Sequence, residues 1–397
     1  MKQKNNFFRI LCLLFTGILT TIQAQGNDLP QLEYYDSVEV SLLTCSPHEE
    51  IYSLYGHSAL RWHDLHTQGA HAGEDIAYNW GIFSFDKPYF VLRFVFGLTD
   101  YELGPIPMNS FCNYYSYWGS SVTEQVLNLS NEEKANLREA LRQNLLPKNR
   151  IYRYNYFYDN CSTRPRNIIE KCINGTIKYA DREDYTPSYR DMIHTATRHH
   201  PWARFGNDML LGVKADQKTT LREQEFLPEN LLYDFDRATI LDNGLYRPLV
   251  KERRMIVTPG VQMIEEDFPL TPSQCAWLLL GVSLIIIILE WKRKKTFVWW
   301  DLLLMAIQGL AGCILFVMLF SQHPTTSTNL QILLLNPLAL FFMVSVAKRR
   351  KTRWWRILVT LAVFFLIGGF FQNYAEGMMI VALCLLLRVI INIKLKD

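Results

Sequence analysis

The chain has 397 residues, of which 49% are hydrophobic and 20% charged, and its 41 Lys and Arg nearly balance its 38 Asp and Glu. This balance argues against a globally basic nucleic-acid-binding protein, and the apolar content excludes an intrinsically disordered chain. Nearly all of the long apolar runs lie after residue 274. The sequence therefore predicts a polar ectodomain, residues 25–273, joined to a membrane domain, residues 274–397.

The N-terminus has the layout of a secretory signal peptide. A basic start and an apolar stretch from Phe7 to about Ile22 precede Ala24, a small residue suited to cleavage. We expect residues 1–24 to be a signal peptide. An uncleaved anchor is the alternative, because Ile22 is unusual three positions before the cut. Either form exports the residues that follow.

The early ectodomain favours strands. Runs rich in Val, Tyr, Trp and Phe, separated by turns with Gly or His, lie at 38–44, 51–62 and 76–85. A helix is predicted over 130–144, where Ser130 precedes Glu133 at capping-box spacing and Leu recurs at every fourth position. Aromatic and polar residues alternate over 152–158, which predicts a strand or an extended lead-in.

The stretch around Cys161 is the most informative part of the chain. Ile and Cys residues after position 167 recur at helical spacing. If Ser162 caps this helix, Pro165 falls in the first turn, where proline loses no backbone hydrogen bond. Cys161 then lies directly ahead of the helix. The helix dipole and the nearby Arg164 and Arg166 should lower the pKa of its thiol, as a nucleophilic cysteine requires.

A cysteine nucleophile also needs a base and a group that orients the base. His57 is the candidate base, because it follows a Gly at the start of a predicted strand. Asn79 on the neighbouring predicted strand would accept from the imidazole, the role of Asn in papain-like Cys-His-Asn sites, with Asp75 as a second candidate. The backbone N–H of Cys161 or Ser162 would stabilise an oxyanion.

Other cysteine roles are open. Cys45 lies close in sequence to His57 and is an alternative nucleophile. The four ectodomain cysteines would also permit two disulfides in an oxidising compartment. A pairing of Cys161 with Cys172 would be awkward, because mostly helix separates them.

We predict no metal and no cofactor. Three further histidines, His63, His66 and His71, have the irregular spacing of a solvated loop rather than that of a metal site.

Five apolar segments fill the C-terminal domain, each of about the length that a tilted helix needs to cross a bilayer. They lie at about 275–291, 299–320, 330–347, 357–372 and 377–391. The loops after the first and third segments are rich in Lys and Arg, whereas the loops at 321–329 and 372–377 contain neither. This alternation predicts basic loops in the cytoplasm and the ectodomain outside it. Asp301 and Arg388 lie near segment ends, so the spans show no signature of an ion pathway.

Three ectodomain motifs together resemble the N-terminal periplasmic domain of the Lnb family, the lipoprotein N-acyltransferases of Bacteroidota. They are Tyr-Gly-His-Ser-Ala-Leu-Arg at 55–61, Tyr-Asn-Trp-Gly-Ile-Phe-Ser-Phe at 78–85 and Asp-Asn-Cys-Ser-Thr-Arg at 159–164. The resemblance covers most of residues 30–270, and the five-segment tail fits the same architecture. The order His, polar residue, Cys is also similar to the permuted papain-like group that includes lecithin:retinol acyltransferase.

The resemblance implies an α+β, permuted papain-like domain in the periplasm, followed by an all-α domain of five transmembrane helices in a bacterial inner membrane. It implies a phospholipid acyl donor, a thioester on Cys161 formed with His57 as base, and the amine of a diacylglyceryl-cysteine lipoprotein as acceptor. Asn79 is the loosest match, because the permuted relatives often have His there. Residues near the thiol that would contact substrate, unless they are solvated structural residues, are Tyr55, Asn160, Arg164 and Arg166.

Two other functions stay open on the sequence. The same Cys161–His57 pair would serve a membrane-tethered cysteine peptidase or amidase that acts on cell-wall peptide. A non-catalytic envelope scaffold is the third. The size of the membrane domain favours the acyltransferase, because one span would suffice to tether a peptidase.

Overall fold

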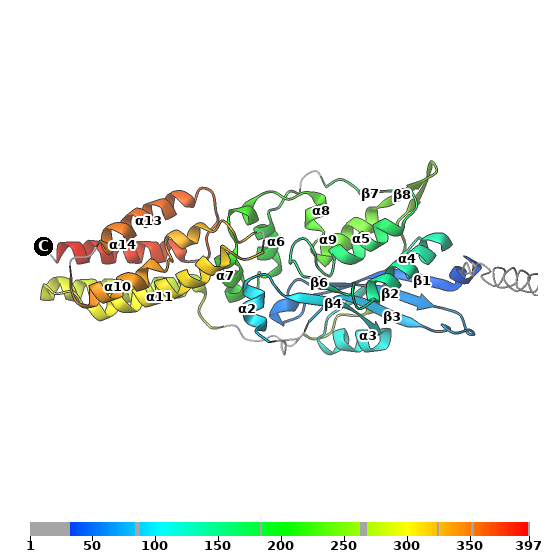
Figure 1. Cartoon of the computed structure of the whole chain (residues 1–397), viewed down its shortest axis with the longest axis horizontal. Helices are drawn as coiled ribbons and strands as arrows, with labels where there is room; N and C mark the ends of the chain where they lie inside the picture. Colours follow the sequence, from blue (N-terminus) through cyan, green and yellow to red (C-terminus); the bar gives the residue numbers. More distant parts are fainter. Residues whose placement is uncertain are drawn as a thin grey trace, which may run out of the picture.

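The computed structural model describes residues 32–83, 88–182, 185–262, 268–323, 325–350 and 353–395. The signal peptide expected at 1–24 lies outside these ranges. A sheet-rich α+β ectodomain and a helical C-terminal region lie end to end (Figure 1).

A seven-stranded antiparallel sheet forms the centre of the ectodomain, in the order β10-β5-β1-β2-β3-β4-β6. Its strands are β1 (Val38–Cys45), β2 (His57–Asp64), β3 (Asp75–Ile82), β4 (Asp100–Pro107), β5 (Val122–Leu127), β6 (Ile151–Arg153) and β10 (Val250–Val257). The edge strand β10 comes from the end of the ectodomain sequence and pairs with β5.

The second predicted strand differs from the structure at its start. Residues Ile51–Ser53 form a 3-10 turn, η2, and β2 begins only at His57. Gly56 makes the turn between them with a φ of +74°, and a Cβ there would lie 2.7 Å from the carbonyl oxygen of Cys45. Because only glycine adopts this backbone without strain in so little space, the turn fixes where His57 enters the sheet.

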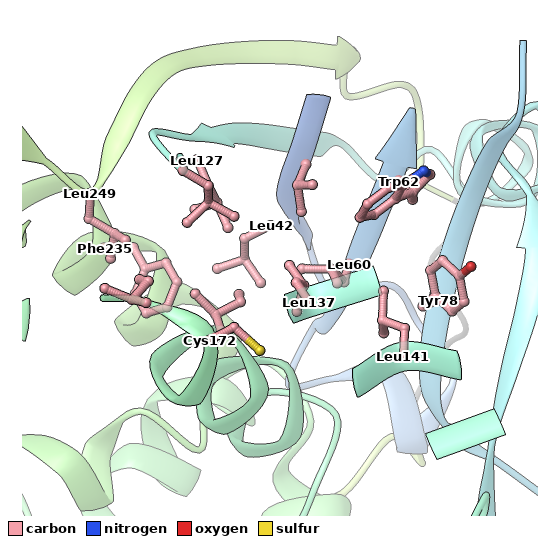
Figure 2. Close-up of a cluster of buried hydrophobic side chains, with 14 of the residues drawn as sticks. Leu42, Leu60, Trp62, Tyr78, Leu127, Leu137, Leu141, Cys172, Phe235 and Leu249 are labelled. Atoms are coloured by element: carbon pink, nitrogen blue, oxygen red, sulfur yellow. The ribbon is translucent and has the colours of Figure 1, made fainter. Parts of the chain in front are cut away.

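Alternating side chains send two cores to the two faces of the sheet. On one face, α4 (Asn131–Leu145), α5 (Thr163–Cys172) and α9 (Pro228–Arg237) pack around Leu42 and Leu60 (Figure 2). On the other face, α3 (Met108–Tyr117) packs against residues such as Leu43.

Helix α4 confirms the helix predicted over 130–144. Ser130 and Glu133 form the predicted capping box, in which each side chain accepts from the other residue's backbone N–H.

The remaining ectodomain elements are short. They are η1 (Leu32–Ser37), α2 (Phe90–Val95), β7 (Thr176–Lys178), α6 (Tyr189–Ala196), α7 (Pro201–Leu210), η3 (Val213–Asp216), α8 (Leu221–Gln224), β8 (Thr239–Asp242) and β9 (Leu245–Pro248). Strands β7, β8 and β9 form a second small sheet, which lies at the end of the ectodomain away from the C-terminal helices (Figure 1).

Each of the five predicted apolar segments contains a helix. They are α10 (Pro272–Arg293), α11 (Val298–Met318), α12 (Leu338–Ala347), preceded by the 3-10 turn η4 (Leu330–Leu333), α13 (Trp354–Gly368) and α14 (Met378–Lys394). Among the residues that the structure describes, three segments, Pro272–Arg293, Val298–Met318 and Leu330–Ala347, are long and apolar enough to cross a membrane.

The ectodomain is joined to the C-terminal helices through the two loops that lack Lys and Arg. The backbone N–H of Gly212 donates to the carbonyl oxygen of Thr325 at 2.8 Å. Asn373 donates from Nδ2 to Asp216 Oδ1 at 2.8 Å. Helix α7 lies between the two regions (Figure 1), and its Phe205 packs against the apolar cluster of the C-terminal helices. These loops therefore lie on the side on which their charge pattern predicts them.

Candidate active site

The turn that carries Cys161 is held by Asn160. Asn160 Oδ1 accepts hydrogen bonds from the backbone N–H groups of Ser162 and Thr163, both at 2.9 Å, and its Nδ2 donates to two backbone carbonyl oxygens at 2.9 Å. Asn160, and not the expected Ser162, therefore caps α5 with its side chain. This buried amide makes all four of its hydrogen bonds inside the ectodomain, so its role is structural and it offers none to a substrate.

Strands β2 and β3 bring His57 and Asn79 together beside Cys161. Asn79 lies opposite Ala59 in the sheet, and Ala59 is two residues after His57, so His57 and Asn79 share one face. His57 Nε2 lies 3.0 Å from Asn79 Oδ1, and a side-chain hydrogen bond joins His57 to Cys161.

The surroundings of the thiol favour its ionised form. Burial raises the pKa of Cys161, but the charge of His57 and hydrogen bonds from His57, the Ser58 backbone N–H and the Ser162 side chain outweigh it, so the pKa is lowered. For His57 the balance is reversed. Burial lowers its pKa, but the charge of Cys161 and hydrogen bonds to Cys161 and Asn79 raise it overall. The pair thus favours thiolate and imidazolium, which activates a nucleophilic cysteine.

The two arginines near the helix start do not contribute to this shift as expected. Arg164 donates two hydrogen bonds to Asp159, at 2.6 and 2.7 Å. Arg166 is buried and donates to Glu225 at 2.7 Å. Both guanidinium groups are held by carboxylates of the ectodomain, so His57 replaces them as the source of positive charge at the thiol. The same pairing argues against both as ligands of a phosphate headgroup.

Two backbone N–H groups, those of Cys161 and Ser162, were candidates for the oxyanion donor, and only one of them is available. The Ser162 N–H is already used by Asn160, which removes it as an oxyanion donor. Within the described residues, the Cys161 N–H donates to no acceptor. The Cys161 N–H is therefore the group that remains available for an oxyanion.

Asp75 and Tyr55 are engaged elsewhere. Asp75, the second candidate for orienting His57, instead accepts two hydrogen bonds from Arg61 at 2.7 Å. The Tyr55 hydroxyl accepts from Asn207 Nδ2 at 2.8 Å. Since Asn207 belongs to α7, Tyr55 links the turn before His57 to the helix that faces the membrane region.

The other cysteines fit structural roles. The seven cysteines of the described ranges are free thiols. Burial raises the pKa of Cys45 well above its usual range, despite a hydrogen bond with Tyr115, which disfavours Cys45 as a nucleophile. Cys172 lies in the core between the sheet and its covering helices (Figure 2).

The three further histidines lie near different carboxylates, and His63 belongs to strand β2 rather than to the expected loop. His66 Nδ1 is 2.6 Å from Asp64 and His71 Nδ1 is 3.6 Å from Glu74. His63 Nε2 is 4.0 Å from Asp75.

Ser58 is the member of the site that sequence reasoning missed. Its backbone N–H donates to Cys161, and its hydroxyl lies 3.0 Å from that of Ser162 in a fully buried pair. Every residue except proline has a backbone N–H, so the residue type of Ser58 does not reveal this contact. Only the close approach of β2 to the start of α5 identifies Ser58 as a donor.

Two family models match the chain. The model of the Lnb N-terminal periplasmic domain matches residues 33–196, which include His57, Asn79 and Cys161, and that of the Lnb transmembrane domain matches residues 263–397. No curated protein and no solved structure matches the chain. The chain belongs to the Lnb family and is a membrane protein with a periplasmic domain.

Proposed function

We propose that this protein is a lipoprotein N-acyltransferase with Cys161 as nucleophile, His57 as base and Asn79 as the group that orients His57. The observation that carries the proposal is the hydrogen-bonded Cys161–His57–Asn79 chain, which lies in a periplasmic domain packed onto apolar helices. The proposal includes a permuted papain-like fold for residues 25–273, a signal peptide at 1–24 and five helices of residues 274–397 crossing the bacterial inner membrane.

In the first half-reaction the Cys161 thiolate attacks the ester carbonyl carbon of a phospholipid. A carbon–sulfur bond forms and the carbon–oxygen ester bond breaks. The His57 imidazolium gives its proton to the departing lysophospholipid oxygen. The Cys161 N–H stabilises the negative charge on the carbonyl oxygen. The products are a thioester on Cys161 and a lysophospholipid.

In the second half-reaction the amine of a diacylglyceryl-cysteine attacks the thioester. Neutral His57 accepts the amine proton as the carbon–nitrogen bond forms and the carbon–sulfur bond breaks. The Cys161 thiolate and the His57 imidazolium are thereby restored. The Asn79 oxygen accepts from Nε2–H throughout, so the imidazole keeps the ring orientation that both proton transfers require.

The test uses full-length protein in liposomes that contain phospholipid with a deuterated acyl chain. Without acceptor, mass spectrometry of the Cys161 peptide should show the deuterated chain in a hydroxylamine-sensitive thioester. Addition of a diacylglyceryl-cysteine peptide should move that chain to the peptide amine. The matched control is Cys112→Ser, which changes a cysteine of α3 outside the proposed site and should transfer normally.

Two results would contradict the proposal. One is acceptor acylation by the Cys161→Ala protein. The other is cleavage of a cell-wall peptide, with no acyl transfer, by the same preparation, which would favour the peptidase alternative.

A further inference from the structure

Helix α2 presents apolar side chains to the outside of the ectodomain. Tyr89, directly before the helix, is 80% exposed, and Leu92 within it is 55% exposed. Single exposed apolar residues are common on soluble proteins. What distinguishes these two is their position relative to the apolar C-terminal helices.

Hydrogen bonds fix α2 to the residues that follow α11. The backbone N–H of Gln322 donates to the carbonyl oxygen of Phe96 at 3.0 Å. His323 Nε2 lies 2.9 Å from the carbonyl oxygen of Phe94. At Gly97 an added Cβ would lie 3.1 Å from the His323 nitrogen, so the two backbones are in close contact.

These contacts limit how far α2 can lie from the end of α11. Helix α11 ends at Met318, and the few residues from there to Gln322 reach at most about 14 Å when fully extended. Headgroup layers add several ångströms on each side of the hydrocarbon core. Figure 1 shows α2 at the end of the ectodomain that faces α10–α14. Helix α2 therefore lies within reach of the membrane surface.

Other exposed aromatic side chains lie just after the ends of two C-terminal helices. Phe320 follows α11, and Phe370 and Phe371 follow α13, and all three are exposed. Aromatic residues at the ends of spanning helices are typical of the membrane–water boundary. Exposed apolar side chains of α2 thus lie beside the end of α11, where other exposed aromatic residues are found.

We propose that α2 lies in the boundary between headgroups and acyl chains of the leaflet that faces the ectodomain, with Tyr89 and Leu92 in contact with phospholipid. Arg93 is already bound to Asp100 at 2.7 Å and to the Leu98 carbonyl oxygen. The contact is therefore made by apolar burial and not by attraction between charges.

The proposal goes beyond the acyl-transfer reaction, because lipid contact by α2 does not require Cys161.

The experiment places the photo-crosslinker p-benzoylphenylalanine at single positions of the full-length chain in phosphatidylethanolamine–phosphatidylglycerol liposomes. Positions Tyr89 and Leu92 are compared with Tyr246 and Leu245 of β9, which are 61% and 76% exposed and belong to the small sheet at the far end of the ectodomain. Phe316 of α11, 47% exposed, is the lipid-facing reference. All chains carry Cys161→Ala, so the result does not depend on catalysis.

Mass spectrometry should find phospholipid adducts at positions 89 and 92 at about tenfold the yield at 245 and 246, as expected for side chains that enter the boundary layer. Moderate salt should leave this ratio unchanged, because the contact is apolar. Adduct yields at 89 and 92 equal to those at 245 and 246 would overturn the proposal. Crosslinks at 89 and 92 mainly to a second copy of the chain would overturn it as well.

Discussion

Two buried polar clusters of this protein use hydrogen bonds in opposite ways. Between the C-terminal helices, Arg388 of α14 donates to Glu290 of α10 at 2.6 Å and to Asp301 of α11 at 2.8 Å, and Asn392 donates to Asp301 at 3.0 Å. In the ectodomain, Cys161, His57 and Asn79 form an open chain that ends in a thiol.

This difference in hydrogen bonding distinguishes a cluster that holds helices together, around Arg388, from a cluster with the features of a reactive site, around Cys161. The cluster around Arg388 is buried, and the carboxylates of Glu290 and Asp301 share its one guanidinium, so it links three helices. In the ectodomain cluster, Cys161 is only half-buried as a residue. Its perturbed pKa values fit a group that reacts. Four predictions test this distinction, from the largest expected effect to the smallest.

Replacement of Cys161 by Ala should abolish acyl transfer, a loss of about 10³-fold or more, and leave thermal unfolding nearly unchanged. The assay is deuterated-chain transfer in liposomes, together with a melting curve in detergent. Cys112→Ser is the matched control and should retain both activity and stability. If Cys161→Ala instead unfolds the protein, the sulfur has a structural role.

Replacement of Arg388 by Met should instead lower the stability of the protein. It leaves Glu290 and Asp301 buried without their cation, which costs about 3–5 kcal/mol, and the melting temperature should fall steeply. The double change Arg388→Met with Glu290→Gln removes one of the stranded charges and should recover part of the loss. An unaltered melting temperature for Arg388→Met would show that the cluster does not hold the helices together.

Replacement of Asn79 by Ala should reduce transfer about 10²-fold and narrow its pH range from the alkaline side. The Asn79 hydrogen bond helps to raise the pKa of His57, so its loss moves the alkaline limit to lower pH. The acid limit should stay nearly unchanged, because on that side His57 is protonated in both proteins and still lowers the pKa of Cys161.

The variant Asn79→Asp adds a negative charge beside the imidazolium and should move the alkaline limit to higher pH. The two variants are compared by their pH–rate profiles. If both profiles have the wild-type limits, Asn79 does not act through His57.

The smallest expected effect concerns the contact between the ectodomain and the loops of the C-terminal helices. A Cβ at Gly212 would overlap the carbonyl oxygen of Thr328, so Gly212→Ala should cost about 1–3 kcal/mol of unfolding free energy. Gly206 on α7 has open space around it, and Gly206→Ala should be neutral or stabilise by up to about 1 kcal/mol. Chemical unfolding of both variants measures the difference. Equal stabilities would show that the junction is loose.

The sequence predicts features that arise between near neighbours. The capping box of Ser130 and Glu133 lies within one helical turn, so spacing alone identifies it. The start of α5 follows in the same way from local helical spacing, whereas the lowered pKa of Cys161 depends on His57, which is distant in the sequence. The pairing of Cys161 with His57 required chemical reasoning about which base a thiol needs.

Features that depend on distant residues were predicted poorly. Arg166 looked like a surface cation because its partner, Glu225, is 59 residues away. Asn160 was assigned to substrate because the backbone carbonyl oxygen of Phe226, which its amide meets, lies in a distant part of the chain. Strand β10 carries many charges and has no strong local signal, and only its pairing with β5 makes it a strand.

That last pairing has a consequence for biosynthesis. Strand β5 leaves the ribosome long before its partner, because β10 ends at Val257 and α10 already begins at Pro272. The β5 edge of the sheet therefore stays open until nearly all of the ectodomain sequence has been made. The order of the strands thus ties completion of this sheet to synthesis of the first C-terminal helix, which follows β10 in the chain.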